Sequence, residues 1–161
     1  MTKPKIILGI DPGYARLGWG VISVSGSNAR LIDYGCIETP KDEELPQRLA
    51  ILNQHLELII AKHNPTDIAI EELFFSKAVT TALNVAHARG VIMLRAVHHC
   101  GNISQYKPNQ IKLATTGVGN ADKKQMQDMV KRILNLREVP KPDDAADALA
   151  VAITHAAYAK Y

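Results

Sequence analysis

Four acidic residues in this 161-residue sequence stand at positions where carboxylates can act together. Asp11 and Glu71 each end an apolar run that is typical of a buried strand. Asp144 and Asp147 are three residues apart in a helical pattern, so their side chains share one face. If the two strands are parallel neighbours, Asp11 and Glu71 meet at the carboxyl edge of the sheet, where open sheets bind ligands.

Each of these acids also has an ordinary structural explanation. An acid after a strand commonly begins a loop, and an acid in the first turn of a helix, such as Asp144, suits the helix dipole. Asp147 is harder to explain, because the small and apolar residues around it over 145–152 require the helix to pack tightly. A buried carboxylate needs a partner, and a metal ion would supply one.

Several converging carboxylates with few histidines or cysteines make a metal site of oxygen ligands, which select Mg²⁺ or Mn²⁺. Two such ions, about 3.5–4 Å apart, stabilise both the attacking and the leaving oxygen in phosphodiester cleavage. The charge distribution fits this chemistry: the chain carries a net charge of +3, and the stretch 107–137 has seven basic residues against two acidic ones. Such a stretch suits contacts to phosphates, although on charge alone a solvated helix face explains it equally well.

The elements that must position these residues follow from the periodicity of the chain. Strands are predicted over 5–11, 17–24, 30–37, 67–71 and 103–106. Helices are predicted over 45–63, 76–100, 108–115, 122–136 and 143–159. The first three strands follow one another through short turns, so they should begin an antiparallel meander. This order predicts an α/β domain with a mixed sheet covered by helices.

The composition argues against several other classes of protein. Crossing a membrane takes roughly 20 consecutive apolar residues, and no segment provides them, so we expect a cytoplasmic protein. Cys36 and Cys100 do not make a disulfide framework, and we interpret both as small buried side chains. The cluster His98-His99-Cys100 does not predict a zinc site, because adjacent helical residues point apart and no second group of ligands is present.

Three acidic motifs resemble those of the RuvC family of Holliday-junction resolvases. They are Ile7-Leu8-Gly9-Ile10-Asp11-Pro12-Gly13, Ile70-Glu71-Glu72-Leu73-Phe74 and Asp144-Ala145-Ala146-Asp147-Ala148-Leu149-Ala150. Ala88-Arg89-Gly90-Val91 and Gly117-Val118-Gly119 with Lys123 also match, so the resemblance covers essentially the whole chain. The motif frames favour Glu71 over Glu72 and Asp144 over Asp143.

The resemblance implies an RNase H-like fold, a five-stranded mixed sheet flanked by helices, in a single nuclease domain over 1–161. It implies paired, Mg²⁺-dependent nicking of four-way junction DNA by a homodimer. Mn²⁺ would substitute for Mg²⁺, two ions would bind at each site, and the RuvA and RuvB proteins would be partners in branch migration.

The resemblance also assigns roles to individual residues. The catalytic, metal-binding carboxylates are matched by Asp11, Glu71, Asp144 and Asp147. Lysines that serve the site and hold DNA are matched by Lys112 and Lys123. Phe74 matches an aromatic side chain that stacks on junction bases.

The helix predicted over 76–100 is our candidate dimer interface. Ala82, Ala86 and Gly90 recur at a spacing of four, which lets two helix backbones approach closely. Further apolar side chains that a single sheet cannot entirely cover are Val79, Leu83, Val91 and Leu94.

Two other functions remain open at this stage. A strand followed by Asp-x-Gly, here Asp11-Pro12-Gly13, also begins the phosphate-binding fold of actin-like ATPases and sugar kinases. Those proteins have two lobes and a second phosphate loop, which this sequence does not provide. The other alternative is an RNase H-like nuclease for another nucleic acid, or a DNA-binding module without activity; the presence of all four acids argues against the inactive form.

Overall fold

The computed structural model describes residues 3–72 and 79–159, and its five strands form one sheet in the order β3-β2-β1-β4-β5. β1 (Lys5–Asp11), β2 (Arg16–Ser25) and β3 (Asn28–Glu38) pair in antiparallel fashion, as the short turns predict. β4 (Asp67–Glu71) is parallel to β1, and β5 (Ile103–Tyr106) is parallel to β4. The predicted mixed sheet and the predicted order of elements are therefore confirmed.

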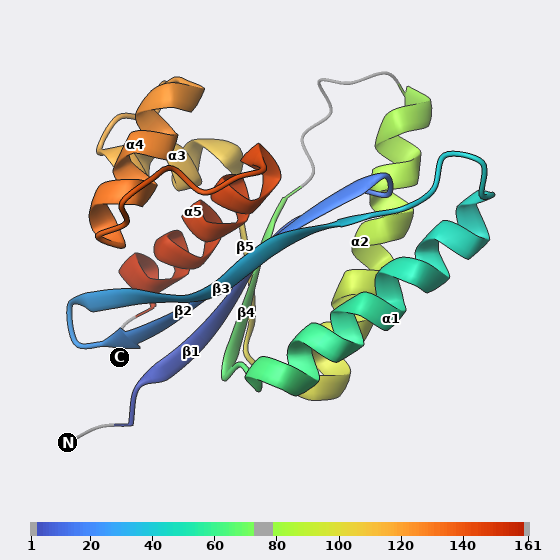
Figure 1. Cartoon of the computed structure of the whole chain (residues 1–161), viewed down its shortest axis with the longest axis horizontal. Helices are drawn as coiled ribbons and strands as arrows, with labels where there is room; N and C mark the ends of the chain where they lie inside the picture. Colours follow the sequence, from blue (N-terminus) through green and yellow to red (C-terminus); the bar gives the residue numbers. More distant parts are fainter. Residues whose placement is uncertain (1–2, 73–78, 160–161) are drawn as a thin grey trace.

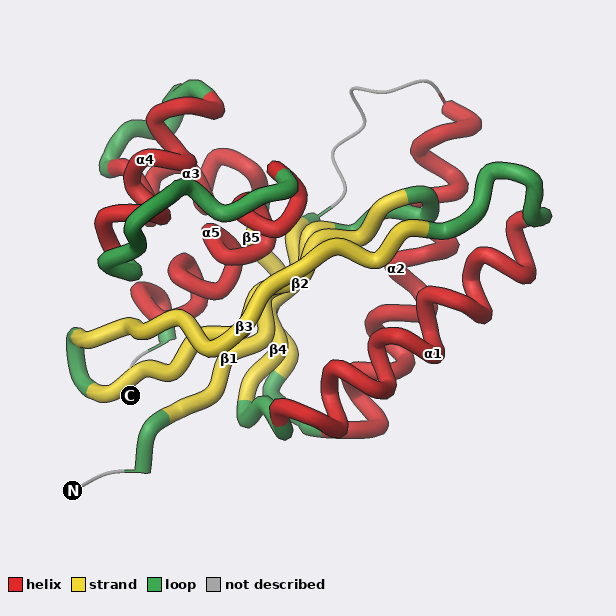
Figure 2. Tube along the Cα trace, viewed as in Figure 1, coloured by secondary structure: helices red, strands yellow, loops and turns green. Residues whose placement is uncertain are grey.

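Two layers of helices cover the sheet, one on each face (Figure 1). α1 (Leu45–His63) and α2 (Val79–His99) lie together on one face. α3 (Pro108–Thr116), α4 (Lys123–Ile133) and α5 (Asp143–Tyr158) form the other layer, and Figure 2 shows the strands running between the two layers. No helix in the described part of the chain is long and apolar enough to cross a bilayer.

Two helix boundaries need comment. α4 ends at Ile133 rather than near residue 136, because Asn135 takes a left-handed conformation with a φ of 53°. The N–H of Leu136 then donates to the carbonyl of Lys131, which closes the helix end. The first residues of the helix predicted over 76–100 lie outside the described part of the chain.

Alternation along the strands sorts their side chains between the two helical layers. Leu8 and Ile10 of β1 pack in the core beneath α1 and α2, whereas Ile7 and Gly9 face α5. Asp11 continues this second set, so its carboxyl group also lies on the α5 side of the sheet. The acid is therefore placed by the same period of two that builds the core.

Glycines let α5 approach the sheet closely. A Cβ atom on Gly9 of β1 would overlap the backbone of Ala148, and one on Gly18 of β2 would overlap the carbonyl oxygen of Asp144. The helix that meets them is rich in alanine and almost entirely buried over 145–155. Small residues on both sides thus bring the first turns of α5 against the edge of the sheet.

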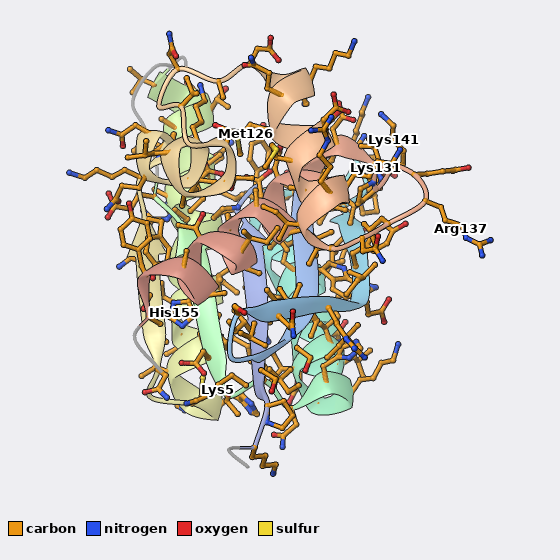
Figure 3. All side chains as sticks on the ribbon, turned by 90° about the vertical axis from the view of Figure 1, so that its left-hand side faces the viewer. Lys5, Met126, Lys131, Arg137, Lys141 and His155 are labelled. Carbon is orange, nitrogen blue, oxygen red and sulfur yellow. The ribbon has the colours of Figure 1, made fainter. Side chains whose placement is uncertain are left out.

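A buried polar network holds the far end of α5. His155 lies between two partners: Tyr106 Oη is 2.9 Å from its Nδ1, and Asp67 Oδ1 is 3.3 Å from its Nε2. Thr66 Oγ1 donates to the second carboxylate oxygen of Asp67 at 2.7 Å. Figure 3 shows His155 near one end of this helix and Lys141 beyond the other. Both ends of α5 are therefore fixed to the sheet.

Candidate active site

The carboxyl ends of β1 and β4 bring Asp11 and Glu71 to the same edge of the sheet. The strands are parallel neighbours with Ile10 beside Ile70, so the next residue of each strand is an acid. Burial raises the pKa of Asp11 well above its usual range, and the charges of Glu71 and Asp147 raise it further. The strand patterns predicted this meeting of the two carboxylates.

The first turns of α5 supply the other two acids. Asp144 lies over Gly18 of β2, and Asp147 follows one turn later on the same face. Burial raises the pKa of Asp147; the charge of Lys123 opposes this shift, and the charge of Asp144 adds to it. The carboxylates of Asp11 and Asp147 are therefore both harder to ionise here than in water.

One cavity of about 500 Å³ collects the predicted site residues. Its lining includes all four predicted carboxylates and both predicted lysines: Asp11, Glu71, Asp144, Asp147, Lys112 and Lys123. The rest of its wall comes from the helical layer that contains α3, α4 and α5. Groups that can bind metal ions and groups that can bind phosphate thus face the same space.

The two lysines reach this cavity from different helices. Lys112 belongs to α3 and Lys123 begins α4, where the carboxylate of Asp122 caps the helix by accepting from the N–H of Gln125 at 2.8 Å. Lys123 Nζ lies 3.0 Å from Asp143 Oδ2. That hydrogen bond raises the pKa of Lys123, so its ammonium group stays charged at neutral pH.

The adjacent acids Asp143 and Asp144 have different neighbours. Asp144 lines the cavity, and its Oδ2 lies 3.0 Å from Arg16 Nε. Asp143 faces Lys123 and Lys141, whose hydrogen bonds lower its pKa to about 2. Asp143 is not among the residues that line the cavity. The geometry therefore places Asp144, and not Asp143, in the lining of the cavity, and the motif frame had favoured the same residue.

Arg16 contacts the cavity residue Asp144, and the sequence analysis did not single it out. It begins β2 and lies two residues before Gly18, so both face α5. Its guanidinium group bridges Asp144 and Glu38, with Arg16 Nη2 3.5 Å from Glu38 Oε1. The only signal in the sequence was the side of the strand on which it falls, because its partner Asp144 is distant along the chain.

The donor set fits a divalent metal ion that prefers oxygen ligands. Four carboxylates face one cavity, and Asp11 is buried among like charges. Over residues 3–72 and 79–159, no three acidic, histidine or cysteine side chains are already drawn together as a metal cage. A cation that drew the carboxylates together would offset the repulsion between them.

The predicted interface helix is only partly available. Ala82 is buried within its own domain, so the expected stripe of small residues does not lie wholly on the surface. Gly90 is exposed, and a Cβ atom built on it would have open space. Val79, Leu83 and Leu94 are 75%, 56% and 59% exposed. Three of the four predicted apolar residues therefore lie on the outer face of α2, and the fourth, Val91, is half-buried.

Three further predicted residues have simple outcomes. Phe74 lies outside the described residues. Cys36 and Cys100 are free thiols, as separate cysteines should be, but both are half-buried rather than fully buried.

Comparison with known proteins shows the family. The family model of the crossover junction endodeoxyribonuclease RuvC matches residues 7–155. The RuvC protein of Alkaliphilus oremlandii is 54% identical over 151 residues, which cover 94% of this chain and 92% of the relative. That of Pseudothermotoga lettingae is 47% identical over 152 residues, which cover 94% of each chain.

Solved structures that are similar to this chain include members of the same family. The structure of Thermus thermophilus RuvC is 36% identical, with a TM-score of 0.87 and coverage of 95% of this chain and 94% of that one. The same protein in complex with a Holliday junction substrate is 35% identical, with a TM-score of 0.89 and coverage of 96% and 94%. The yeast mitochondrial Holliday junction resolvase Ydc2, at 16% identity and a TM-score of 0.69, shares the fold. This chain belongs to the RuvC family of crossover junction endodeoxyribonucleases.

Proposed function

We propose that this chain resolves four-way DNA junctions by hydrolysing one phosphodiester bond in each of two strands of like polarity. The observation that carries this proposal is the single cavity that holds four carboxylates beside two lysines. Membership of the RuvC family supports the reaction. The Thermus thermophilus relative, solved with a Holliday junction substrate, supports the choice of DNA.

Within this function the acidic and basic residues have separate tasks. The proposed metal ligands are Asp11, Glu71, Asp144 and Asp147. Mg²⁺ is the proposed ion, with Mn²⁺ as a substitute, because hard cations prefer carboxylate oxygens. Two ions are proposed for each site. When bound, such ions stabilise the charge that develops on the attacking and leaving oxygens.

Lys112 and Lys123 hold the phosphates of the strand that enters the cavity. An ammonium group gives a compact positive charge that binds phosphate without reading the base, so these contacts position the strand. The ion pair with Asp143, at 3.0 Å, favours the charged form of Lys123. Phe74 is proposed to stack on a base near the branch point, a contact worth about 1–3 kcal/mol.

We also propose that two copies act together as a two-fold homodimer. One cavity per chain cannot reach two strands at once, whereas an isologous dimer presents two identical sites. The apolar outer face of α2 supports this arrangement. Beside it lies a hollow of about 610 Å³, whose lining combines apolar and polar side chains: Leu49, Ala50, Asn53, Val91, Leu94, Arg95 and His98. Residues 1–161 would act as one nuclease domain in the cytoplasm, with RuvA and RuvB as partners in branch migration.

A nicking assay tests the proposed reaction. The wild-type chain should cut a four-way junction in the presence of Mg²⁺ and leave a linear duplex and an RNA–DNA hybrid of the same sequence largely intact. Glu71→Gln and Asp147→Asn should lower the cutting rate at least a thousandfold, because each removes a proposed metal ligand, while junction binding stays within about threefold.

Asp128→Asn, on α4 outside the cavity lining, is the matched control and should cut normally. Normal cutting by Glu71→Gln would contradict the assignment of Glu71 as a metal ligand of the site. Equal cutting of the RNA–DNA hybrid would favour the alternative of a nuclease for another nucleic acid.

A further inference from the structure

A second hollow, of about 810 Å³, adjoins the catalytic cavity. Its lining consists of Arg16, Lys123, Lys141, Pro142, Asp143 and Asp144. Lys123 and Asp144 also line the catalytic cavity, so the two spaces meet at these side chains. A strand that occupies the first space can therefore continue into the second.

Three cations surround this second hollow, and each is held by a carboxylate. Arg16 Nε lies 3.0 Å from Asp144 Oδ2. Lys123 Nζ and Lys141 Nζ lie 3.0 and 3.1 Å from the two oxygens of Asp143. Among the residues that line the hollow, three positive charges face two negative ones, and Glu38, the second partner of Arg16 at 3.5 Å, lies outside the lining.

We propose that this second hollow binds a backbone phosphate of the DNA strand, next to the phosphate that is cut, through Arg16 and Lys141. The inference rests on the proposed function and extends it to two residues outside the catalytic cavity. A guanidinium group can bind a phosphate through two parallel hydrogen bonds, and a lysine adds a point charge.

The exposure of the ion pairs lets a phosphate compete for these cations. The side chains of Arg16 and Lys141 are 47% and 71% exposed, and Asp143 is 42% exposed. Ion pairs in contact with water contribute little stability, so exchanging a carboxylate partner for a phosphate costs little. Figure 3 shows the labelled side chains of Lys141, Lys131 and Arg137 toward the same side of the molecule.

The alternative is that these pairs only fix the start of α5 on the sheet. The two explanations differ in what salt does to DNA binding. Each phosphate contact releases a counterion, so each contributes about 0.9 to the slope of log Kd against log salt concentration. A purely structural pair contributes nothing to that slope.

The test is equilibrium binding of a fluorescent four-way junction, in EDTA to prevent cutting, over a series of salt concentrations. We expect Arg16→Gln and Lys141→Gln each to lower the slope by about one and to weaken binding about five- to tenfold at 0.1 M salt. Arg16→Lys keeps the charge and should keep the slope. Within the described part of the chain, the side chain of Lys141 pairs with Asp143 alone, so its variant tests the proposal even if Arg16→Gln fails to fold.

Matched controls lie on other surfaces. Lys62 also pairs with an aspartate, Asp33, at 2.7 Å, so Lys62→Gln breaks a comparable ion pair far from the hollow. Arg30→Gln removes an exposed arginine of β3. Slopes in Arg16→Gln and Lys141→Gln that equal those of the two controls would overturn this inference. A wild-type chain that binds the junction no better than a linear duplex would instead count against the proposed function.

Discussion

Among single residues, Asp11 shows how a site for cations weakens the fold that carries it. Burial and the neighbouring carboxylates raise the pKa of Asp11 well above the value of about 3.9 in an unfolded chain. Between these two pKa values the folded protein holds a proton that the unfolded chain has lost. The contribution of Asp11 to the free energy of unfolding therefore falls as the pH rises above about 4 and is lowest above the folded pKa.

We accordingly predict that Asp11→Asn is more stable than the wild type in metal-free buffer at pH 7. The melting temperature should rise by about 3–6 °C, since the variant removes a buried charge from a group of like charges. The difference should shrink as the pH falls toward 4 and vanish below it, because the wild-type carboxyl group is then protonated in the folded and the unfolded state alike. Thermal melts in EDTA across this range provide the measurement.

The exposed residue Asp42 supplies the control for this prediction. Asp42→Asn lies on the surface and should change the melting temperature by less than about 1 °C at any pH. If Asp11→Asn melted below the wild type at pH 7, Asp11 would be stabilised by its surroundings and the repulsion among the carboxylates would be the wrong description.

The sequence predicted the acidic residues of the site better than its arginine. Asp11 and Glu71 each follow an apolar strand, and Asp147 interrupts an apolar helix, so each departs from a local pattern. Arg16 departs from no pattern, because an arginine at the start of a strand is ordinary. Its importance comes from a contact with Asp144 that exists only once β2 and α5 have packed.

Between elements, the contact of α5 with β2 decides where two of the carboxylates lie. Gly18 meets the backbone carbonyl of Asp144, whereas Gly20, on the same face of β2, meets mainly the side chain of Leu149. A backbone atom cannot move without its helix, but a leucine side chain can change rotamer. The two glycines are thus a matched pair for testing the placement of α5.

We predict that Gly18→Ala lowers the nicking rate at least tenfold, because the added methyl group pushes Asp144 and its helix away from the sheet. Gly20→Ala should destabilise the fold by about 1–3 kcal/mol but reduce nicking less at temperatures where both variants are folded. Nicking assays and thermal melts of the two variants give the comparison, with Gly101→Ala, which has open space, as a neutral control. Equal loss of nicking in both variants would mean that α5 is not positioned by Gly18.

The elements were predicted well from the sequence where their pattern was long, and less well at their ends. The period of four and three over 45–63 gave α1 its observed bounds, and the short turns gave the antiparallel pairing of the first three strands. The end of α4 was wrong by three residues because Leu134 and Leu136 continue an apolar pattern through the left-handed Asn135. A turn residue that tolerates a positive φ is a weak signal beside apolar neighbours.

For the whole molecule, the outer face of α2 bears on assembly. Leu83, Leu94 and Val97 are each more than half exposed, which is costly for a monomer and suits contact with a second copy. The sequence could predict that this helix is apolar on more than one side, but the fold was needed to show that Ala82 faces inward and Leu83 outward. Only the outward residues can test the proposed dimer without disturbing the core.

We predict that Leu83→Glu and Leu94→Glu convert a dimer to a monomer at micromolar concentration without lowering the melting temperature by more than about 2–4 °C, because both side chains already contact water. Leu58→Glu, on α1 and 67% exposed, is the control and should remain dimeric.

Sedimentation measures the oligomeric state, and a supercoiled plasmid that extrudes a four-way junction measures the effect of that state on cutting. Paired incision by the dimer releases linear DNA, whereas a monomer that cuts one strand at a time accumulates nicked circles, so the ratio of linear to nicked product should fall in the two α2 variants and not in Leu58→Glu. A wild-type chain that sediments as a monomer both free and on junction DNA would rule out the dimer, and a variant that stays dimeric with both charges in place would move the interface away from α2.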